Sequence, residues 1–139
     1  MNAILRRRTL LLTLLPVAAL FLASPRPAAF ALGLAAAGAG EAVRLWSTGH
    51  IVKAVELTRT GPYAWVRNPL YLGSLLITVG WGLMSGRAAV ALVLLAVFAL
   101  THGAAIRSEE RFLRERFGAE FEEYARRVPR LLPTRRPLP

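Results

Sequence analysis

The chain contains no cysteine among its 139 residues. This absence excludes disulfide bonds, a thiolate nucleophile and cysteine-based metal sites, but it does not define a cellular compartment. Acidic residues are also few: 8 of them stand against 18 lysines and arginines, which gives a net charge of +10. A basic excess of this size suits either nucleic acid or an anionic membrane surface. Only the positions of the charges distinguish these two partners.

Hydrophobic residues make up 55% of the chain and occur in long uninterrupted runs. About 20 apolar residues are needed to cross ~30 Å of hydrocarbon, so the shorter runs also need flanking residues or a locally thinner bilayer. Lipid satisfies no backbone polar group, which favours helix for every span. We therefore predict an all-α fold, with 1–139 as one domain and an integral membrane bundle of about four transmembrane helices. The predicted helices cover 9–24, 28–46, 69–85 and 88–106.

The first run also resembles a secretory signal peptide, because Arg6-Arg7-Arg8 precedes the apolar segment 9–23. A second apolar run follows after only Ser24-Pro25-Arg26-Pro27. This spacing favours a tight turn between two membrane helices. In the second helix, Gly33 and Ala37 have the small-xxx-small spacing that lets helix backbones approach closely.

The basic residues are distributed asymmetrically. Apart from Arg26 and Arg87, all of them lie in the N-terminus, in the loop 41–69 or after residue 106. With four spans these segments share one side of the membrane, so the positive-inside rule predicts that both termini and the central loop are cytoplasmic. We expect the membrane to be the cell inner membrane. We expect membrane lipids as partners of this charge, and no nucleic acid.

The loop before the third predicted helix has a strong helix-start pattern. Asparagine is a good N-cap and proline is favoured at the first helical position, so Asn68-Pro69 predicts a helix that begins at the cytoplasmic interface. Its N-terminus carries partial positive charge, and Arg67 adds a partner for a carboxylate. The pattern indicates an anion-binding place. The alternative is an interfacial belt in which Arg67 reaches lipid headgroups.

Two adjacent carboxylates follow the fourth predicted span. Glu110 is spaced i,i+3 from Arg107 and i,i+4 from Arg114, so we assign it to a helix-surface ion pair worth only ~0.2 to 0.5 kcal/mol. Glu109 lies on the face of Ile106 and is the better candidate to hold a cationic amine. Beyond it, apolar residues recur at helical spacing with a break at Gly118.

The segment 107–128 is therefore predicted as cytoplasmic interfacial helices that form the floor of a pocket. The Pro- and Arg-rich end, 129–139, is predicted as a flexible tail.

Three motifs together resemble the isoprenylcysteine carboxyl methyltransferase and phospholipid methyltransferase superfamily, over roughly residues 50–133. They are Gly61-Pro62-Tyr63-Ala64-Trp65-Val66-Arg67-Asn68-Pro69-Leu70-Tyr71-Leu72-Gly73, Glu109-Glu110 and Phe117-Gly118-Ala119-Glu120-Phe121-Glu122-Glu123-Tyr124. The resemblance implies a membrane-embedded methyltransferase that uses S-adenosylmethionine, needs no metal and acts on a lipid or other hydrophobic or lipidated acceptor. With Arg67 from the helix-start argument, the cofactor-binding residues would be Leu57, Tyr63, Arg67, Asn68, Pro69, Leu70, Tyr71 and Glu109.

The sequence departs from the family pattern at two positions. Asn68 stands where the family often has histidine, although asparagine retains its hydrogen-bonding groups. Ala105 stands where prenylcysteine methyltransferases carry a substrate-associated arginine, four residues ahead of the first glutamate. Arg107 is a candidate to replace that arginine after a small helix rotation. The acceptor therefore stays open among lipid amines, carboxylates, hydroxyls and hydrophobic thiols.

His102, within the fourth span, is a candidate proton acceptor, because an ionisable group at membrane depth is often functional. A hydrogen bond to a neighbouring helix explains it equally well.

Two other protein classes remain open. Sterol and steroid reductases of membranes share the Asn-Pro-x-Tyr and Phe-Gly-x-x-Phe-x-x-Tyr elements and bind NADPH, but this chain is short for them and shows no added basic cluster for a 2'-phosphate. The third class is a non-enzymatic membrane protein.

Overall fold

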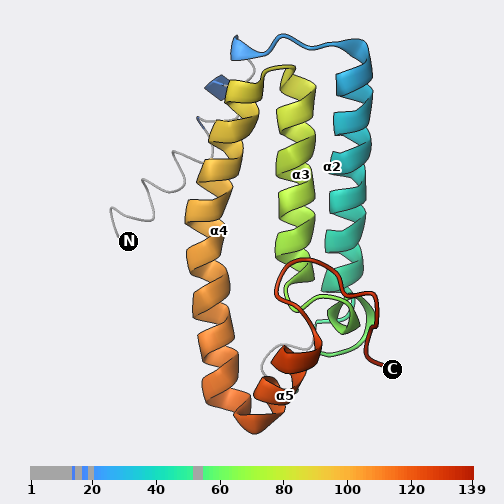
Figure 1. The fold of residues 1–139 in the computed structure, drawn as a ribbon, viewed down its shortest axis with the longest axis vertical. Helices are drawn as coiled ribbons and strands as arrows, with labels where there is room; N and C mark the ends of the chain where they lie inside the picture. Colours follow the sequence, from blue (N-terminus) through green and yellow to red (C-terminus); the bar gives the residue numbers. More distant parts are fainter. Residues whose placement is uncertain (1–13, 15–16, 19–20, 52–54) are drawn as a thin grey trace.

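The computed structural model describes residues 14, 17–18, 21–51 and 55–139. In these residues the structure is helical and contains no strand. The elements are α2 (Pro27–Thr48), the 3₁₀ helix η1 (Gly61–Ala64), α3 (Pro69–Ser85), α4 (Ala88–Phe117) and α5 (Ala119–Arg127). The long helices α2, α3 and α4 run side by side, and α5 folds under the end where α2 stops and α3 starts (Figure 1). The predicted helix at 9–24 falls mostly outside the described residues and stays a prediction.

Two described helices are long and apolar enough to cross a membrane. They are α2, with 22 residues, and α4, with 30, whereas α3 is a shorter apolar helix of 17 residues. The start and end of α3 at Pro69 and Ser85 agree with the sequence pattern. Gly86 follows α3 in the left-handed conformation, with a φ of 67°, which suits a glycine C-cap.

The observed C-terminal end of α4 differs from the predicted end of the fourth helix. The sequence pattern predicted a fourth transmembrane helix over 88–106 and interfacial helices from 107, but α4 runs without a break to Phe117. The physical reason is that 107–117 consists mainly of good helix formers and contains neither glycine nor proline. The predicted break at Gly118 is present, with a φ of 51°. The apolar part and the charged part of α4 therefore belong to one continuous helix.

Backbone contact between α2 and α3 depends on pairs of glycines. A Cβ atom built on Gly40 would lie 2.5 Å from the carbonyl oxygen of Gly73, and one on Gly73 would lie 2.6 Å from that of Gly40. Gly33 and Gly80 meet in the same way about two helical turns further along, and Ala37 also lies against Gly80. This confirms the close approach predicted from the spacing of Gly33 and Ala37.

The segment after α5 is not the free tail that the sequence predicted. Its backbone pairs with the loop before α3 at three points: Arg67 N–H donates to Pro129 O (2.9 Å), Thr134 N–H to Trp65 O (2.9 Å) and Leu138 N–H to Ala64 O (3.1 Å). The polar backbone groups of this loop gain partners that no regular helix or sheet supplies. The C-terminal segment thus becomes part of the structure around α3's N-terminus.

Candidate functional site

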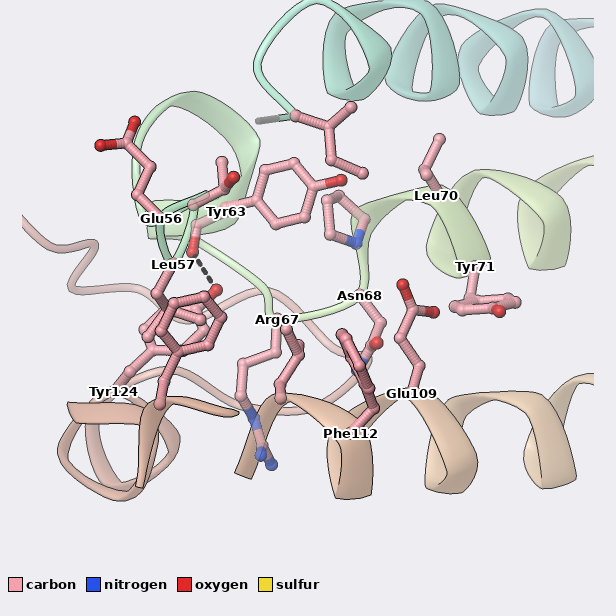
Figure 2. A pocket seen from close by; sticks show the side chains of 15 residues that line it. Glu56, Leu57, Tyr63, Arg67, Asn68, Leu70, Tyr71, Glu109, Phe112 and Tyr124 are labelled. Atoms are coloured by element: carbon pink, nitrogen blue, oxygen red, sulfur yellow. Dashed lines mark hydrogen bonds between the residues drawn. The ribbon is translucent and has the colours of Figure 1, made fainter. Parts of the chain in front are cut away.

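A cavity of about 280 Å³ lies between the loop before α3, the lower part of α4 and α5. All eight residues that the sequence analysis assigned to a cofactor line this cavity (Figure 2). They are Leu57, Tyr63, Arg67, Asn68, Pro69, Leu70, Tyr71 and Glu109. The remaining walls include apolar side chains of α4, namely Phe112, Leu113 and Phe117. All three belong to the segment 107–128, which the sequence predicted as the floor of a pocket.

Glu109 supplies an acidic group to the cavity. It lies on α4, and its carboxylate extends toward the start of α3, where Asn68, Leu70 and Tyr71 are found (Figure 2). The residue is exposed overall, so solvent or a ligand can reach it. A carboxylate in this position is suited to an ammonium group.

Tyr63 is a neutral hydrogen-bonding group in the cavity wall. It is only 8% exposed, and burial together with the nearby charge of Glu109 raises its pKa to about 12. The phenol therefore keeps its proton at neutral pH and can donate a hydrogen bond. The carbonyl of Tyr63 accepts a hydrogen bond from the Tyr124 hydroxyl at 2.7 Å, which joins η1 to α5 (Figure 2).

The start of α3 confirms the helix-start prediction in position but not in chemistry. Pro69 is the first helical residue and Asn68 the N-cap residue, yet the Asn68 side chain makes no capping hydrogen bond. Its Nδ2 instead donates to Glu110 Oε1 (2.9 Å) and to the carbonyl of Arg130 (3.0 Å). The first turn of α3 is thus left without a side-chain cap, because the two hydrogen bonds of Nδ2 hold the amide in an orientation in which Oδ1 accepts from no backbone N–H of that turn.

Glu110 corrects the sequence analysis most clearly. It was assigned to an ion pair on the surface of α4, but its side chain is only 3% exposed and contacts Arg130 and Arg67. Arg130 Nε and Nη2 lie 3.0 and 2.9 Å from Glu110 Oε2, and Arg67 Nη1 lies 3.4 Å from Oε1. The proposed surface partner Arg114 pairs with Glu122 instead. These partners are distant in sequence, and helix periodicity carries no signal for them.

Arg67 lines the cavity, but its charge faces a protein carboxylate. Its side chain is 12% exposed, pairs with Glu110 and also lies 6.0 Å from the centre of the Phe121 ring. The pairing of Arg67 with a ligand carboxylate, predicted from the helix-start pattern, stays a prediction.

The two candidate catalytic residues lie outside the residues that line the cavity. His102 stacks on Phe98, with 4.4 Å between ring centres, and its ring meets that of Tyr71 edge-on at 5.7 Å. Its Nδ1 is also 2.9 Å from Thr101 Oγ1. Tyr71 lines the cavity, so His102 contacts a cavity residue without lining the cavity itself. Arg107 is exposed on α4. Their roles remain predictions.

The helices and the cavity together indicate the class of protein. Apolar helices of membrane-spanning length, with a largely apolar cavity that also carries a few polar side chains at one end of the bundle, are features of an integral membrane protein. Residues 39–120 match the phospholipid methyltransferase family, and the chain belongs to that family. The match includes the loop before α3, α3 itself, α4 and the beginning of α5.

Three curated relatives extend this comparison. The chain is 41% identical over 109 residues to the cobalt-zinc-cadmium resistance protein CzcN of Cupriavidus metallidurans (77% of this chain, 50% of the relative). It is 42% identical over 92 residues to the nickel-cobalt-cadmium resistance protein NccN of Alcaligenes xylosoxydans xylosoxydans (65% and 43%). It is 34% identical over 87 residues to the protein-S-isoprenylcysteine O-methyltransferase of Saccharomyces cerevisiae (59% and 36%).

The chain spans half or less of the length of each of these relatives. No solved structure matches it. Among the described residues, no group of three or more histidine or acidic side chains is placed to hold a metal ion.

Proposed function

We propose that this protein transfers a methyl group from S-adenosylmethionine to a lipid or other hydrophobic acceptor at the cytoplasmic face of the membrane. The observation that carries the proposal is the cavity at the start of α3. It gathers, from two distant parts of the chain, every residue that the family pattern assigns to the cofactor. Family membership and the named activity of the yeast relative support the same chemistry.

The residues present fit the proposed cofactor. The Glu109 carboxylate suits its ammonium group, and the first turn of α3, which has no side-chain cap, offers backbone N–H groups to its carboxylate. Leu57, Phe112 and Phe117 provide apolar and aromatic surface for the adenine ring. The cavity volume of about 280 Å³ lies close to the lower end of the range of small-molecule sites, roughly 300–1,000 Å³.

The protein's task in this reaction is positioning. S-adenosylmethionine supplies a methyl group that its sulfonium already activates. The cavity residues hold the reactants in line and exclude water, and the neutral Tyr63 phenol contributes a hydrogen-bond donor. An ionised carboxylate acceptor would need no base, whereas an amine or hydroxyl acceptor has to lose a proton. For those acceptors, His102 behind Tyr71 is the candidate to receive it.

The acceptor is proposed as a hydrophobic molecule that reaches the site from the membrane, with both termini and the cavity on the cytoplasmic side of the inner membrane. The excess of basic residues at this end of the bundle supports that orientation. Ala105, which stands where prenylcysteine methyltransferases have an arginine, disfavours a prenylcysteine carboxylate. Arg107 is the nearby basic residue available to an anionic acceptor.

Calorimetric titration of the detergent-purified protein with S-adenosylhomocysteine, alongside NADPH, tests the proposal. We expect saturable binding of S-adenosylhomocysteine and none of NADPH. Binding of NADPH alone would replace the proposal with a reductase, and binding of neither ligand would contradict an enzymatic cavity of either kind. Transfer of label from methyl-labelled S-adenosylmethionine into a membrane lipid extract then identifies the acceptor.

A further inference from the structure

An ion pair with a buried carboxylate and a half-exposed arginine lies beside the cavity residue Asn68. Glu110, on α4, is 3% exposed, and Arg130, from the C-terminal segment, places both Nε and Nη2 within 3.0 Å of its Oε2. A buried carboxylate is strongly dependent on its partners, because it has lost the solvation that would otherwise stabilise its charge. The pair therefore fixes the C-terminal segment against α4.

The same carboxylate holds a residue of the cavity wall. Glu110 Oε1 accepts one hydrogen of the Asn68 amide at 2.9 Å, and the backbone carbonyl of Arg130 accepts from the same nitrogen at 3.0 Å. Both partners of Asn68 thus come from the Glu110–Arg130 pair. The backbone contact between Arg67 and Pro129 lies beside them and holds the same loop.

The hydrogen bonds of Asn68 determine which atom of its side-chain amide is available to a ligand. Both amide hydrogens are engaged within the protein, and the side chain caps no backbone N–H of α3. The reversed amide would set its oxygen against the Glu110 carboxylate, where two acceptors repel, so this orientation is excluded. Oδ1 is therefore the amide atom left for the cavity, and it accepts a hydrogen bond.

We propose that Glu110 and Arg130 are positioning residues that orient Asn68 as an acceptor for an N–H group of the cofactor, which makes the C-terminal segment part of the binding site. This inference rests on the proposed function. The cofactor carries suitable donors in its ammonium group and in its adenine amino group. Glu110 itself touches no ligand in this account, in contrast to Glu109.

The test uses the full chain with Arg130→Gln and Glu110→Gln, each of which removes one charge of the pair at nearly constant size. Arg127→Gln is the matched control, because Arg127 lies three residues away in an exposed ion pair with Glu123. We measure S-adenosylhomocysteine affinity by calorimetry, KM and kcat for methyl transfer, and hydrogen exchange of the segments 63–72 and 129–139.

Both variants are expected to bind S-adenosylhomocysteine at least about tenfold more weakly, and KM for S-adenosylmethionine is expected to rise while kcat at saturation stays within about twofold. Exchange in 63–72 should become faster, Arg127→Gln should behave as wild type, and Arg130→Lys should recover part of the affinity. A purely structural role would instead lower the folded fraction without this separation of KM from kcat.

Unchanged affinity and unchanged exchange in either variant would overturn the inference and leave the proposed function standing. If one variant is not recovered in folded form, the other carries the test. If the wild type binds no S-adenosylhomocysteine, the proposed function fails and the acceptor role of Asn68 fails with it; faster exchange over 63–72 in the variants would then show only that the pair holds this loop in place.

Discussion

Two adjacent glutamates on α4 occupy different environments. Glu109 is exposed and lines the cavity, whereas Glu110 is buried between Arg67 and Arg130. On a helix, neighbouring residues point about 100° apart, so one side chain can face a ligand while the other faces the interior. A single acidic motif thus supplies one carboxylate to the cavity and one to a buried contact with two arginines.

At Glu109, we predict that Glu109→Gln weakens S-adenosylhomocysteine binding by about tenfold, or ~1.4 kcal/mol, because the amide no longer offers a full negative charge to the ammonium group. Glu115→Gln is the matched control, since Glu115 is exposed on the same helix and does not line the cavity. Calorimetry measures both. Equal affinities in the two variants would remove Glu109 from the assigned site.

At Tyr63, the raised pKa predicts a specific loss of stability in alkali. The unfolded chain ionises this phenol near its ordinary pKa of 10.0, but the folded protein holds the proton until about 12. The contribution of Tyr63 is therefore constant below pH 10 and is lost as the pH rises from about 10 to 12, because ionisation then favours the unfolded state.

Thermal midpoints of wild type and Tyr63→Phe in detergent check this prediction. Tyr63→Phe should lose less stability over that interval, although some loss remains because burial also raises the pKa of Tyr124. Identical pH profiles for the two proteins would contradict the assigned environment of Tyr63.

Among the elements, α2 and α3 depend on glycine for their contact. We predict that Gly40→Ala destabilises the protein by about 1–3 kcal/mol, because the added Cβ would lie 2.5 Å from the carbonyl of Gly73 and force the helices apart. Gly38→Ala is a strong control: it lies two residues away on the same helix, and nothing stands within 4 Å of its Cβ position.

The thermal midpoint in detergent is the measurement for this pair. Gly40→Ala should lower it clearly, while Gly38→Ala should leave it unchanged or raise it slightly through better helix propensity. A Gly40→Ala midpoint equal to that of Gly38→Ala would show that α2 and α3 can separate at no cost.

The elements also show what a sequence can and cannot predict. The bounds of α3 and the break at Gly118 follow from local signals, namely Asn68-Pro69, an apolar run and glycine conformation. The length of α4 was underestimated, because the change from apolar to charged residues after residue 106 does not end the helix. The composition of a segment indicates whether its surroundings are apolar or polar, whereas a helix ends where its backbone hydrogen bonds end.

In the site, seven of the eight proposed cofactor residues came from family resemblance and Arg67 came from the helix-start pattern; all eight line one cavity. The partners of Glu110 were missed for a physical reason. Asn68 is 42 residues away and Arg130 is 20 residues away, so only the folding of the C-terminal segment onto the loop brings them together. Neither helical spacing nor composition encodes such a contact, and a Pro- and Arg-rich end suggested disorder.

At the scale of the whole molecule, charge separates the two ends of the bundle. The cavity, α5 and the lower part of α4 form one end, with nearly all the described basic residues, while Arg26 and Arg87 lie at the other end, beside the starts of α2 and α4 (Figure 1). If this polarity sets the orientation, the cavity opens to the cytoplasm. Water-soluble S-adenosylmethionine would then reach it directly.

Single-cysteine labelling tests this orientation, and the chain suits it because it has no native cysteine. We predict that Arg26→Cys reacts with a membrane-impermeant maleimide in intact spheroplasts, whereas Glu115→Cys reacts only after the membrane is permeabilised. Both positions are exposed, so burial does not explain a difference in labelling. The cysteine-free wild type is the blank. Labelling of Glu115→Cys in intact spheroplasts would place the cavity outside the cytoplasm and would separate the site from the compartment in which the proposed cofactor is made.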